Sequence, residues 1–437
     1  MGNPKLYIET YGCQMNTNDS EVVASVLCNS GFEMTETIEE ASLIILNTCA
    51  VRDHAENKIF QRLNVIKKLK TTNHELLVGV IGCMAERLKE QLFERNVKVD
   101  IVCGPDSYRK IPELVAIAGK NNQAINVHLS DSETYSDISP MHLGHNRLSA
   151  FISIMRGCDN FCTYCIVPYT RGRERSRDAQ SIIEEAKNLE KNGFKEVTLL
   201  GQNVNSYNHE DFTFPKLMEA VTQAVPSMRV RFTTSHPKDL SNDLLVVMAA
   251  NNNICKNIHL PVQSGSTNVL ELMNRKYTRE WYLDRIAAIK QIVPDVTLST
   301  DILSGFCNET EEDHQDTLSL MKTVGFDTAF MFKYSVRPGT LAEKRFEDNI
   351  PEDIKLRRLN EIINLQNELS CLSNEADINK TFEVLVEGIS KKSKEEFYGR
   401  TSQNKVVVFP KGDAKIGDFV NVKIKGFTSA TLMGENI

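Results

Sequence analysis

The sequence lacks any apolar run of the roughly 18 residues that a membrane-spanning helix needs. Its first residues, MGNPKLYIET, also lack the basic stretch followed by an apolar segment that is typical of an export signal. Apolar residues make up 41% and charged residues 25% of the chain, as in an ordinary globular protein. These features argue against a membrane-spanning or secreted protein, and we expect a cytoplasmic one.

A strong excess of basic residues is absent as well. The formal net charge of −7 argues against non-specific nucleic-acid binding by the whole chain. The charge is uneven, however, because residues 376–437 contain ten Lys and Arg against eight Asp and Glu, which leaves −9 for residues 1–375. The C-terminal part is therefore the basic part of the chain.

A fourth cysteine is missing from the motif GCDNFCTYC. The motif contains Cys158, Cys162 and Cys165, and Cys255 follows only ninety residues later. A structural zinc or an electron-transfer cluster normally has four protein ligands. Because eleven cysteines in a chain without an export signal argue against a disulfide framework, metal or catalytic use is favoured. Three ligands in one loop would leave one metal position open for a small molecule.

The first third of the chain alternates between strand and helix patterns. Apolar, β-branched runs predict strands at 5–13, 42–49, 76–83 and 99–104. Helix patterns occupy 19–31, with Asp19 or Ser20 as the N-cap, and then 55–70 and 85–96. This alternation predicts a Rossmann-like parallel α/β domain over residues 1–130, and the polar stretch 131–147 reads as a linker.

The remainder contains two further blocks. Six strand–helix units over residues 144–373 are fewer than the eight of a closed TIM barrel, so we expect a partial (β/α)6 barrel that is open at one side. Its predicted strands are 150–155, 196–201, 229–234, 257–262, 297–303 and 329–334. Period-two alternation in residues 376–437 predicts strands at 381–390, 396–401, 405–409 and 418–427. These short strands indicate a small antiparallel β-barrel, an architecture that often binds nucleic acid.

A second set of three cysteines lies in the first block. Cys13, Cys49 and Cys83 each end a predicted strand, and the carboxyl ends of parallel strands gather ligands at one edge of a sheet. Neighbouring strands are about 4.8 Å apart, so the three could hold one cluster. The alternative is that they only pack as small apolar residues. We interpret the remaining cysteines as packing residues, namely Cys28, Cys103, Cys255, Cys307 and Cys371.

The C-x3-C-x2-C motif after a strand resembles the signature of radical S-adenosylmethionine (SAM) enzymes. Further stretches extend the resemblance along the chain to the methylthiotransferases, namely ETYGCQMNTNDSE, LNTCAVRDHAENK, GCMAERL, YTRGRERSR and GQNVNSY. The resemblance implies a radical SAM core followed by a C-terminal TRAM domain. It also implies two 4Fe-4S clusters, one on Cys158, Cys162 and Cys165 that binds SAM, and an auxiliary one on the other three cysteines.

The family resemblance also implies a reaction. One SAM methylates a sulfur on the auxiliary cluster, and a second SAM gives the radical that removes hydrogen from carbon 2 of an adenine. YGCQMN and YTRGRERSR favour the branch that modifies N6-dimethylallyladenosine at tRNA position 37. The same chemistry on threonylcarbamoyladenosine in tRNA or on an aspartate of a ribosomal protein is the alternative. A non-enzymatic iron-sulfur RNA-binding sensor is a hypothesis of another class. A flavodoxin-type electron donor and a monomeric state are expected from the family.

Several residues are candidates for contacts beyond the cluster ligands. SAM contacts are predicted for Tyr164, Gly201, Gln202, Asn203, Ser235 and Gln263. For each polar residue among them, a hydrogen-bonded loop cap is an equal alternative. Phosphate contacts with tRNA are predicted for Arg171, Arg173, Arg175, Arg177, Lys391, Lys392 and Arg400. The four arginines alternate, so an extended segment would show them on one face, and a solvated charged loop is the alternative.

One loop departs from the family pattern. Where the family usually has GFPGET, this chain has GFCNET, with Cys307 and Asn308 in place of Pro and Gly. Asn tolerates positive φ better than most residues. We therefore expect the turn to persist.

Overall fold

The structure, a computed structural model, describes residues 2–50, 53–94, 97–120, 122–144 and 147–437. The chain forms two compact units. The first contains residues 1–145, 151–161 and 165–185, and the second contains residues 146–150, 162–164 and 186–437. None of the helices in these described ranges combines the length and apolar character that a membrane crossing requires.

A parallel six-stranded sheet forms the centre of the first unit, in the order β2-β1-β3-β4-β5-β6. Every neighbouring pair is parallel, as the alternating pattern predicts. The strands are β1 (Lys5–Thr10), β2 (Glu33–Met34), β3 (Leu43–Thr48), β4 (Leu77–Gly82), β5 (Ile101–Cys103) and β6 (Ala124–Asn126). β1, β3 and β4 are direct neighbours, so the strand ends that carry the predicted auxiliary cysteines lie along one edge.

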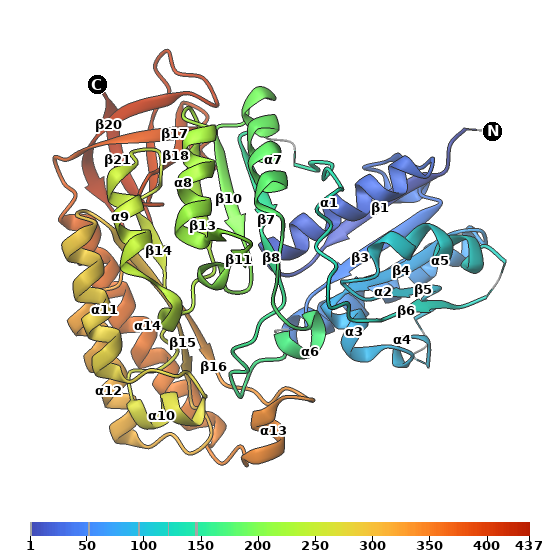
Figure 1. The fold of residues 1–437 in the computed structure, drawn as a ribbon, viewed down its shortest axis with the longest axis horizontal. Helices are drawn as coiled ribbons and strands as arrows, with labels where there is room; N and C mark the ends of the chain where they lie inside the picture. The colour runs from blue at the N-terminus through green and yellow to red at the C-terminus, as the bar shows by residue number, and fades with distance from the viewer. Residues whose placement is uncertain (1, 51–52, 95–96, 121, 145–146) are drawn as a thin grey trace. The chain divides into compact units, whose positions relative to one another are not determined.

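Helices cover both faces of this sheet (Figure 1). They are α1 (Gln14–Asn29), α2 (Asp53–Thr72), α3 (Cys83–Leu88), α4 (Gln91–Glu94) and α5 (Ile111–Ala118). Successive residues of a strand point to opposite faces, and Ile44 accordingly packs with α2 and α3 while Ile45 packs with α1 and α5. The predicted helix 85–96 is divided at Lys89, whose φ is 50°. The predicted N-cap is wrong, because α1 begins at Gln14 with Cys13 as its N-cap.

The polar stretch that reads as a linker packs against this domain. Residues 131–144 form no helix or strand, yet Tyr135 is only 3% exposed and stacks on Tyr108 at 5.5 Å between ring centroids. Its hydroxyl donates to the carbonyl of Pro105 and accepts from the backbone N–H of Tyr108. The stretch is therefore part of the core of the first unit.

The rest of the first unit is the segment around GCDNFCTYC. β8 (Met155–Arg156) pairs in antiparallel fashion with β9 (Arg175–Ser176), and α6 (Val167–Arg171) lies between them in the chain. α7 (Ala179–Lys191) begins at the end of this segment and continues into the second unit. A Cβ on Gly157 would lie 1.9 Å from the carbonyl oxygen of Arg173, so only glycine permits this close return of the chain.

Six barrel strands occur where the sequence predicts them. They are β7 (Ser149–Ser153), which begins in the second unit, β10 (Glu196–Leu200), β13 (Arg229–Thr233), β14 (Asn257–His259), β15 (Thr297–Ser304) and β16 (Thr328–Lys333). They pair in two groups, β13-β10-β7 and β14-β15-β16. A short hairpin of β11 (Asn208–His209) and β12 (Phe212–Thr213) follows β10. This arrangement is the predicted partial barrel.

The helices of the second unit follow its strands. They are α8 (Phe214–Ala224), α9 (Asn242–Ala250), α10 (Thr267–Leu272), α11 (Arg279–Ile292), α12 (Glu311–Val324), α13 (Leu341–Arg345) and α14 (Glu352–Glu375). Asn308 has a φ of 64° and Cys307 is 1% exposed. The GFCNET turn therefore persists, with Asn in the left-handed conformation, as predicted.

A closed barrel of five strands forms the C-terminal end, in the order β17-β18-β19-β21-β20 (Figure 1). The strands are β17 (Thr381–Ile389), β18 (Glu396–Thr401), β19 (Val406–Pro410), β20 (Phe419–Phe427) and β21 (Leu432–Asn436). The sequence pattern missed β21. Four pairs are antiparallel and β19–β21 is parallel, because an odd number of alternating strands cannot close without one parallel pair.

The small barrel is joined to the strands of the partial barrel. Arg229 donates to the carbonyls of Glu383 and Arg400, and Arg231 donates to those of Thr401 and Ser402. The N–H of Lys256, just before β14, donates to the Ser402 hydroxyl at 2.9 Å. The turn after β18 is thus held at the amino ends of the strands, opposite the ends where such folds carry chemistry.

Candidate functional site

The three cysteines of the first unit stand where their strands end. Cys49 directly follows β3, Cys83 directly follows β4 and begins α3, and Cys13 follows β1 as the N-cap of α1. Glycine precedes two of them. A Cβ on Gly12 would lie 2.6 Å from Cβ of Cys49, and one on Gly82 would lie 2.8 Å from the carbonyl oxygen of Thr48. The two glycines therefore let neighbouring strand ends approach closely.

The three thiols differ in burial and in their charged neighbours. Cys49 and Cys83 are each 5% exposed, and Cys13 is exposed. Burial raises the pKa of the Cys83 thiol, Arg171 lowers it, and the charge of Cys13 raises it. The three cysteines follow the neighbouring strands β1, β3 and β4, as predicted, and their role as cluster ligands stays a prediction.

Asn16 links two of the cysteine-bearing segments. It is fully buried, and its Oδ1 accepts from the Cys13 backbone N–H at 3.4 Å and from the Cys13 thiol at 3.3 Å. Its Nδ2 donates to Oδ1 of Asn47 at 2.9 Å and to the carbonyl of Thr48 at 3.2 Å, just before Cys49. This side chain fixes the N-cap of α1 against the end of β3.

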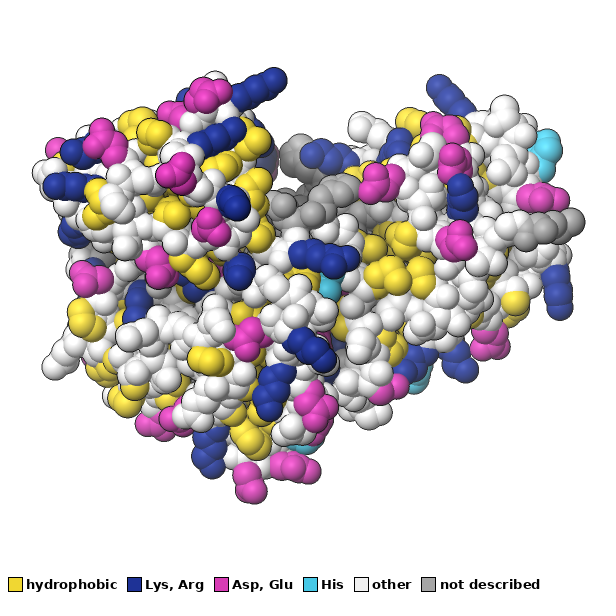
Figure 2. Space-filling view, turned by 90° about the horizontal axis from the view of Figure 1, so that it is seen from above, with side chains coloured by type: hydrophobic (Ala, Val, Ile, Leu, Met, Phe, Trp, Pro, Cys, Tyr) yellow, Lys and Arg dark blue, Asp and Glu magenta, His cyan; other side chains and the backbone are white. Residues whose placement is uncertain are grey.

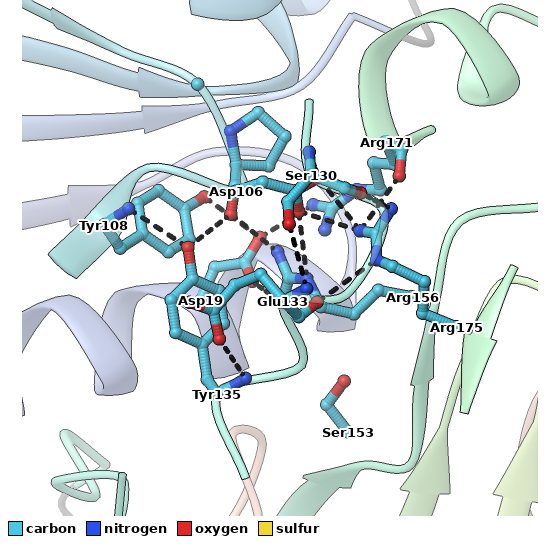
Figure 3. Close-up of polar contacts among 12 residues, drawn as sticks. Asp19, Asp106, Tyr108, Ser130, Glu133, Tyr135, Ser153, Arg156, Arg171 and Arg175 are labelled. Carbon is cyan, nitrogen blue, oxygen red and sulfur yellow. Dashed lines mark hydrogen bonds and ion pairs between the residues drawn. The ribbon is translucent and has the colours of Figure 1, made fainter. Parts of the chain in front are cut away.

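A buried ionic network lies beside Cys83, and Figure 3 shows its arginines Arg156, Arg171 and Arg175 with Asp19 and Asp106. Arg171, at the end of α6, donates from Nε to the Cys83 sulfur at 3.2 Å and from Nη2 to Oδ2 of Asp19 at 2.7 Å. Asp19 also accepts from Nη1 of Arg156 at 2.8 Å and from the Tyr108 hydroxyl at 3.1 Å. Burial acts to raise the pKa of Asp19, but Arg156 and Arg171 outweigh it and lower the pKa. Asp19 is therefore ionised in a fully buried position.

The alternating arginines do not share one exposed face, so this expectation is wrong for three of them. Arg171, Arg175 and Arg177 are 3%, 6% and 5% exposed. Arg175 donates to both carboxylate oxygens of Asp106, and Arg177 donates to Glu185. The cause is that the segment is not extended throughout: Arg171 ends a helix and Arg175 starts β9. Arg173 remains at the surface, with 64% of its side chain exposed beside Asp159.

The GCDNFCTYC loop lies between β8 and α6 in the chain. Cys158 and Cys165 belong to the first unit and Cys162 to the second. In the first unit, Nδ2 of Asn160 donates to the Cys158 sulfur at 3.5 Å. In the second, Nη1 of Arg275 donates to the Cys162 sulfur at 3.3 Å. Two of the three cysteines thus have a nitrogen donor on sulfur, which suits a thiolate ligand.

The predicted SAM contacts follow the carboxyl ends of barrel strands in the second unit. Gly201 directly follows β10, and its N–H donates to the carbonyl of Thr233. Asn203 is fully buried, and it donates to Asp239 and accepts from the N–H of His236, so it holds the loop. Ser235 donates to Oδ1 of Asn205 at 3.0 Å. The loop-cap alternative therefore accounts for the side-chain bonds of Asn203 and Ser235.

Unpaired polar atoms distinguish other residues on these loops. Among the described residues, Oε1 of Gln202, Nδ2 of Asn205 and Nε2 of His236 are buried without a hydrogen-bond partner. Burial, and then the charge of Arg275, lowers the pKa of His236, so the ring is neutral. Gln263 has a φ of 73° and exchanges backbone bonds with β15. Buried unpaired atoms at strand ends suit a polar ligand.

Tyr164 and the basic residues of the C-terminal barrel complete the predicted set. The Tyr164 hydroxyl accepts from Nη1 of Arg275 at 3.4 Å, and its ring contacts Phe306 edge to face. Lys391 and Lys392 are exposed in the turn after β17, and Arg400 is exposed within β18. On the face shown in Figure 2, Lys and Arg side chains are interspersed with Asp and Glu side chains.

The sequence pattern missed the residues that contact the sulfurs and the residues that hold those contacts in place. Asp19 reads as a helix cap, and the pattern assigns no role to Asn16, Arg156 or Arg275. The one available signal is that Asp19 and Asn16 lie on the face of α1 that also carries Val23 and Leu27. Their partners are up to 152 residues away in sequence, which no local pattern reveals.

Comparisons with known proteins agree along the whole chain. Residues 5–104 match the Uncharacterized protein family UPF0004, residues 152–321 the Radical SAM superfamily, and residues 375–437 the TRAM domain. Among solved structures, the radical S-adenosylmethionine methyltransferase TsrM from Kitasatospora setae is similar in fold, with a TM-score of 0.60 at 14% identity. The match covers 78% of this chain and 77% of that one.

Curated relatives are much more similar. The tRNA-2-methylthio-N(6)-dimethylallyladenosine synthase of a Bacteroides fragilis strain is 60% identical, covering 100% of this chain and 96% of the relative. The protein of the same name from a Bacteroides thetaiotaomicron strain is also 60% identical, with the same coverage. At this identity over the full length, the chain belongs to the tRNA-2-methylthio-N(6)-dimethylallyladenosine synthase family.

Proposed function

We propose that this protein is a radical SAM transferase that adds a methylthio group to carbon 2 of N6-dimethylallyladenosine at tRNA position 37. Its full-length relatives bear the name of this activity, and its core matches the Radical SAM superfamily. The observation that carries the proposal is the presence of two three-cysteine sets, each with a buried arginine on one sulfur.

The first unit fits an auxiliary 4Fe-4S cluster. Cys13, Cys49 and Cys83 end three neighbouring parallel strands, and thiolates are the usual ligands of such clusters. Nη1 of Arg171 is buried without a hydrogen-bond partner among the described residues. An unpaired cationic donor beside a ligand thiol fits a group with anionic sulfur.

The second cluster and SAM are assigned to Cys158, Cys162, Cys165 and the loops of the second unit. The unpaired atoms of Gln202, Asn205 and His236 are suited to hold a polar ligand at the strand ends. Tyr164, Gly201, Asn203, Ser235 and Gln263 stay predicted contacts. Because His236 is neutral, it adds no second positive charge against the sulfonium of SAM.

When bound, SAM on the cluster of Cys158, Cys162 and Cys165 would supply the radical that removes hydrogen, and the auxiliary cluster would supply the sulfur. The chain itself binds and orients these groups. Arg275 fixes the Cys162 sulfur, with Nη2 on the carbonyl of Pro261 at 2.6 Å. Arg171 fixes the Cys83 sulfur from the end of α6. No general base of the protein is assigned.

The RNA side of the proposal rests on the C-terminal barrel and one loop arginine. Lys391, Lys392, Arg400 and Arg173 are exposed, and arginine and lysine bind phosphate well. If they contact tRNA, the affinity falls as salt rises, with a slope set by the number of phosphates contacted. Substitution of Lys391 and Lys392 by Gln should reduce that slope without changing SAM cleavage.

Nucleoside mass spectrometry of tRNA tests the substrate. Deletion of the gene should remove 2-methylthio-N6-dimethylallyladenosine and leave N6-dimethylallyladenosine, and plasmid-borne protein should restore the product. An unchanged product would reject this substrate, and loss of a methylthiolated threonylcarbamoyladenosine or ribosomal aspartate would favour the corresponding alternative.

Reconstituted protein separates the enzyme from a non-enzymatic RNA-binding sensor. With dithionite and SAM, the enzyme should form 5′-deoxyadenosine, whereas a sensor would not. The cytoplasmic location, the flavodoxin-type electron donor and the monomeric state stay predictions from the family.

A further inference from the structure

Arg171 lies in the segment that directly follows the GCDNFCTYC motif in sequence. α6 begins two residues after Cys165 and ends at Arg171. Ile166, at the start of this segment, is buried with Ala50 and Cys83. The segment that follows one predicted cluster ligand therefore packs directly on a ligand of the other predicted cluster.

The orientation of the Arg171 guanidinium is fixed by buried partners. Nη2 donates to Asp19, which is fully buried and is held in turn by Arg156 and Tyr108 (Figure 3). The carbonyl of Arg171 accepts from Nη2 of Arg175 at 3.2 Å. With both its backbone and its guanidinium held, Arg171 presents Nε to the Cys83 sulfur without needing to reorganise.

The charges in this network do not balance. Two buried carboxylates, Asp19 and Asp106, face three buried arginines, Arg156, Arg171 and Arg175. One positive charge is left over, and Nη1 of Arg171 has no hydrogen-bond partner among the described residues. An uncompensated buried charge is costly unless an anion neutralises it.

We propose that Arg171 is a positioning residue that binds anionic sulfur at the auxiliary site. It fixes Cys83 as a ligand through Nε, and its excess charge stabilises a sulfide or persulfide carried there. The proposal rests on the proposed function, because it assumes that Cys13, Cys49 and Cys83 hold the auxiliary cluster. Arg171 therefore favours the state of the auxiliary site in which the additional sulfur is bound.

The test uses full-length protein in which Cys158, Cys162 and Cys165 are replaced by Ala, so that only the auxiliary cluster can form. Iron and sulfide are first quantified after anaerobic reconstitution. A protein without a cluster would reject the ligand assignment of the proposed function, and this outcome is distinct from failure of the Arg171 proposal. Sodium sulfide is then titrated while the electron paramagnetic resonance spectrum of the reduced cluster is recorded.

Arg171→Gln is compared with Arg177→Gln in this background. Both arginines are buried and bound to a carboxylate, and Arg177 donates to Glu185, to the Ser181 hydroxyl and to the carbonyl of Ser153. Arg171→Gln should raise the sulfide concentration at half-saturation about tenfold and shift the reduction potential of the cluster to more negative values. Arg177→Gln should change neither. Equal behaviour of the two variants would overturn the proposal.

A purely structural role is tested by removing the carboxylate as well. Arg171→Gln removes one of the two arginines that contact Asp19, and the double variant Asp19→Asn/Arg171→Gln removes the carboxylate that they share as well. Sulfide affinity and potential should stay impaired in the double variant, because the donor to sulfur is still missing. Recovery of both properties would show that Arg171 only neutralises Asp19, and would overturn the proposal. If the single variant does not fold, the double variant provides the same comparison.

Discussion

In each of the two units a buried arginine donates to a cysteine sulfur, but the charges around the two arginines differ. In the first unit, Arg171 donates to a cysteine sulfur while a buried carboxylate, Asp19, holds it. In the second, Arg275 donates to Cys162 and, among the residues that the structure describes, to the neutral oxygens of Pro261, Tyr277 and Tyr164. The comparison teaches that the first site is held together by charge pairs before any ligand binds, whereas the second keeps its full positive charge for the sulfur.

The cysteines give the largest expected effect. Alanine at Cys13, Cys49 and Cys83 together should abolish the methylthiolated nucleoside and leave SAM-derived 5′-deoxyadenosine, because the radical-forming site is intact. Alanine at Cys158, Cys162 and Cys165 should abolish both products. Liquid chromatography with mass spectrometry of both products checks this. If the first variant also lost 5′-deoxyadenosine, the two sets would not have separate roles.

The sequence predicts that Cys49 and Cys83 follow strand ends, because strand-end placement is a local property. Cys49 and Cys83 follow hydrophobic runs that can only be buried strands, and a parallel sheet aligns their ends. The strand β21 was missed because Leu432–Asn436 contains Gly434 and two polar residues, so period two is weak there. It becomes a strand because the barrel must close.

The arginines show where local reasoning ends. Alternation at Arg171, Arg173, Arg175 and Arg177 predicts one face only if the chain is extended, and a helix end and a short antiparallel pair break that condition. The burial of Arg171 and Arg175 depends on Asp19 and Asp106, which are 152 and 69 residues away from them in sequence. Long-range pairing of charges is set by the tertiary fold, so composition and periodicity give no sign of it.

Asp19→Asn should have the next largest effect, on stability. Loss of the carboxylate leaves Arg156 and Arg171 buried without their shared partner, which costs about 3–5 kcal/mol. Tyr277→Phe in the second unit removes a neutral acceptor from Arg275 and a neutral donor to the Val262 carbonyl, and should cost about 1–2 kcal/mol. Urea denaturation followed by circular dichroism measures both. Equal losses would mean that the charge pairs of the first unit do not dominate its stability.

Arg275→Gln should act on the radical-forming site. Removing the charge-assisted bond to Cys162 should lower 5′-deoxyadenosine formation about tenfold, and Arg275→Lys should be intermediate because it keeps the charge but loses the fork of donors. Arg171→Gln should leave this rate unchanged in the absence of tRNA. If Arg275→Gln and Arg171→Gln lost 5′-deoxyadenosine formation equally, the two arginines would not act on separate sites.

Glu86 should give the smallest effect, with a sign opposite to that of Asp19. Glu86 is 3% exposed in α3, and its Oε2 lacks a hydrogen-bond partner among the described residues. Burial raises its pKa to about 7, while Lys89 lowers the pKa and Asp106 raises it. A Cβ on Gly104 would lie 2.1 Å from Oε2, so the carboxyl is confined.

Because the folded pKa of Glu86 lies above the unfolded value of 4.5, stability falls as pH rises from about 4.5 to about 7, and the full penalty persists above that range. Glu86→Gln stays neutral at every pH. The variant should therefore gain about 1–3 kcal/mol over the parent between pH 5 and pH 8, measured by urea denaturation at both values. For Asp19, whose pKa is lowered from the usual value of 3.8, stability is instead lost only as pH falls below that value, so the difference between Asp19→Asn and the parent should stay constant between pH 5 and pH 8. A Glu86→Gln difference independent of pH would mean that this carboxyl is ionised without penalty, and the contrast between a paired and an unpaired buried carboxylate would not hold.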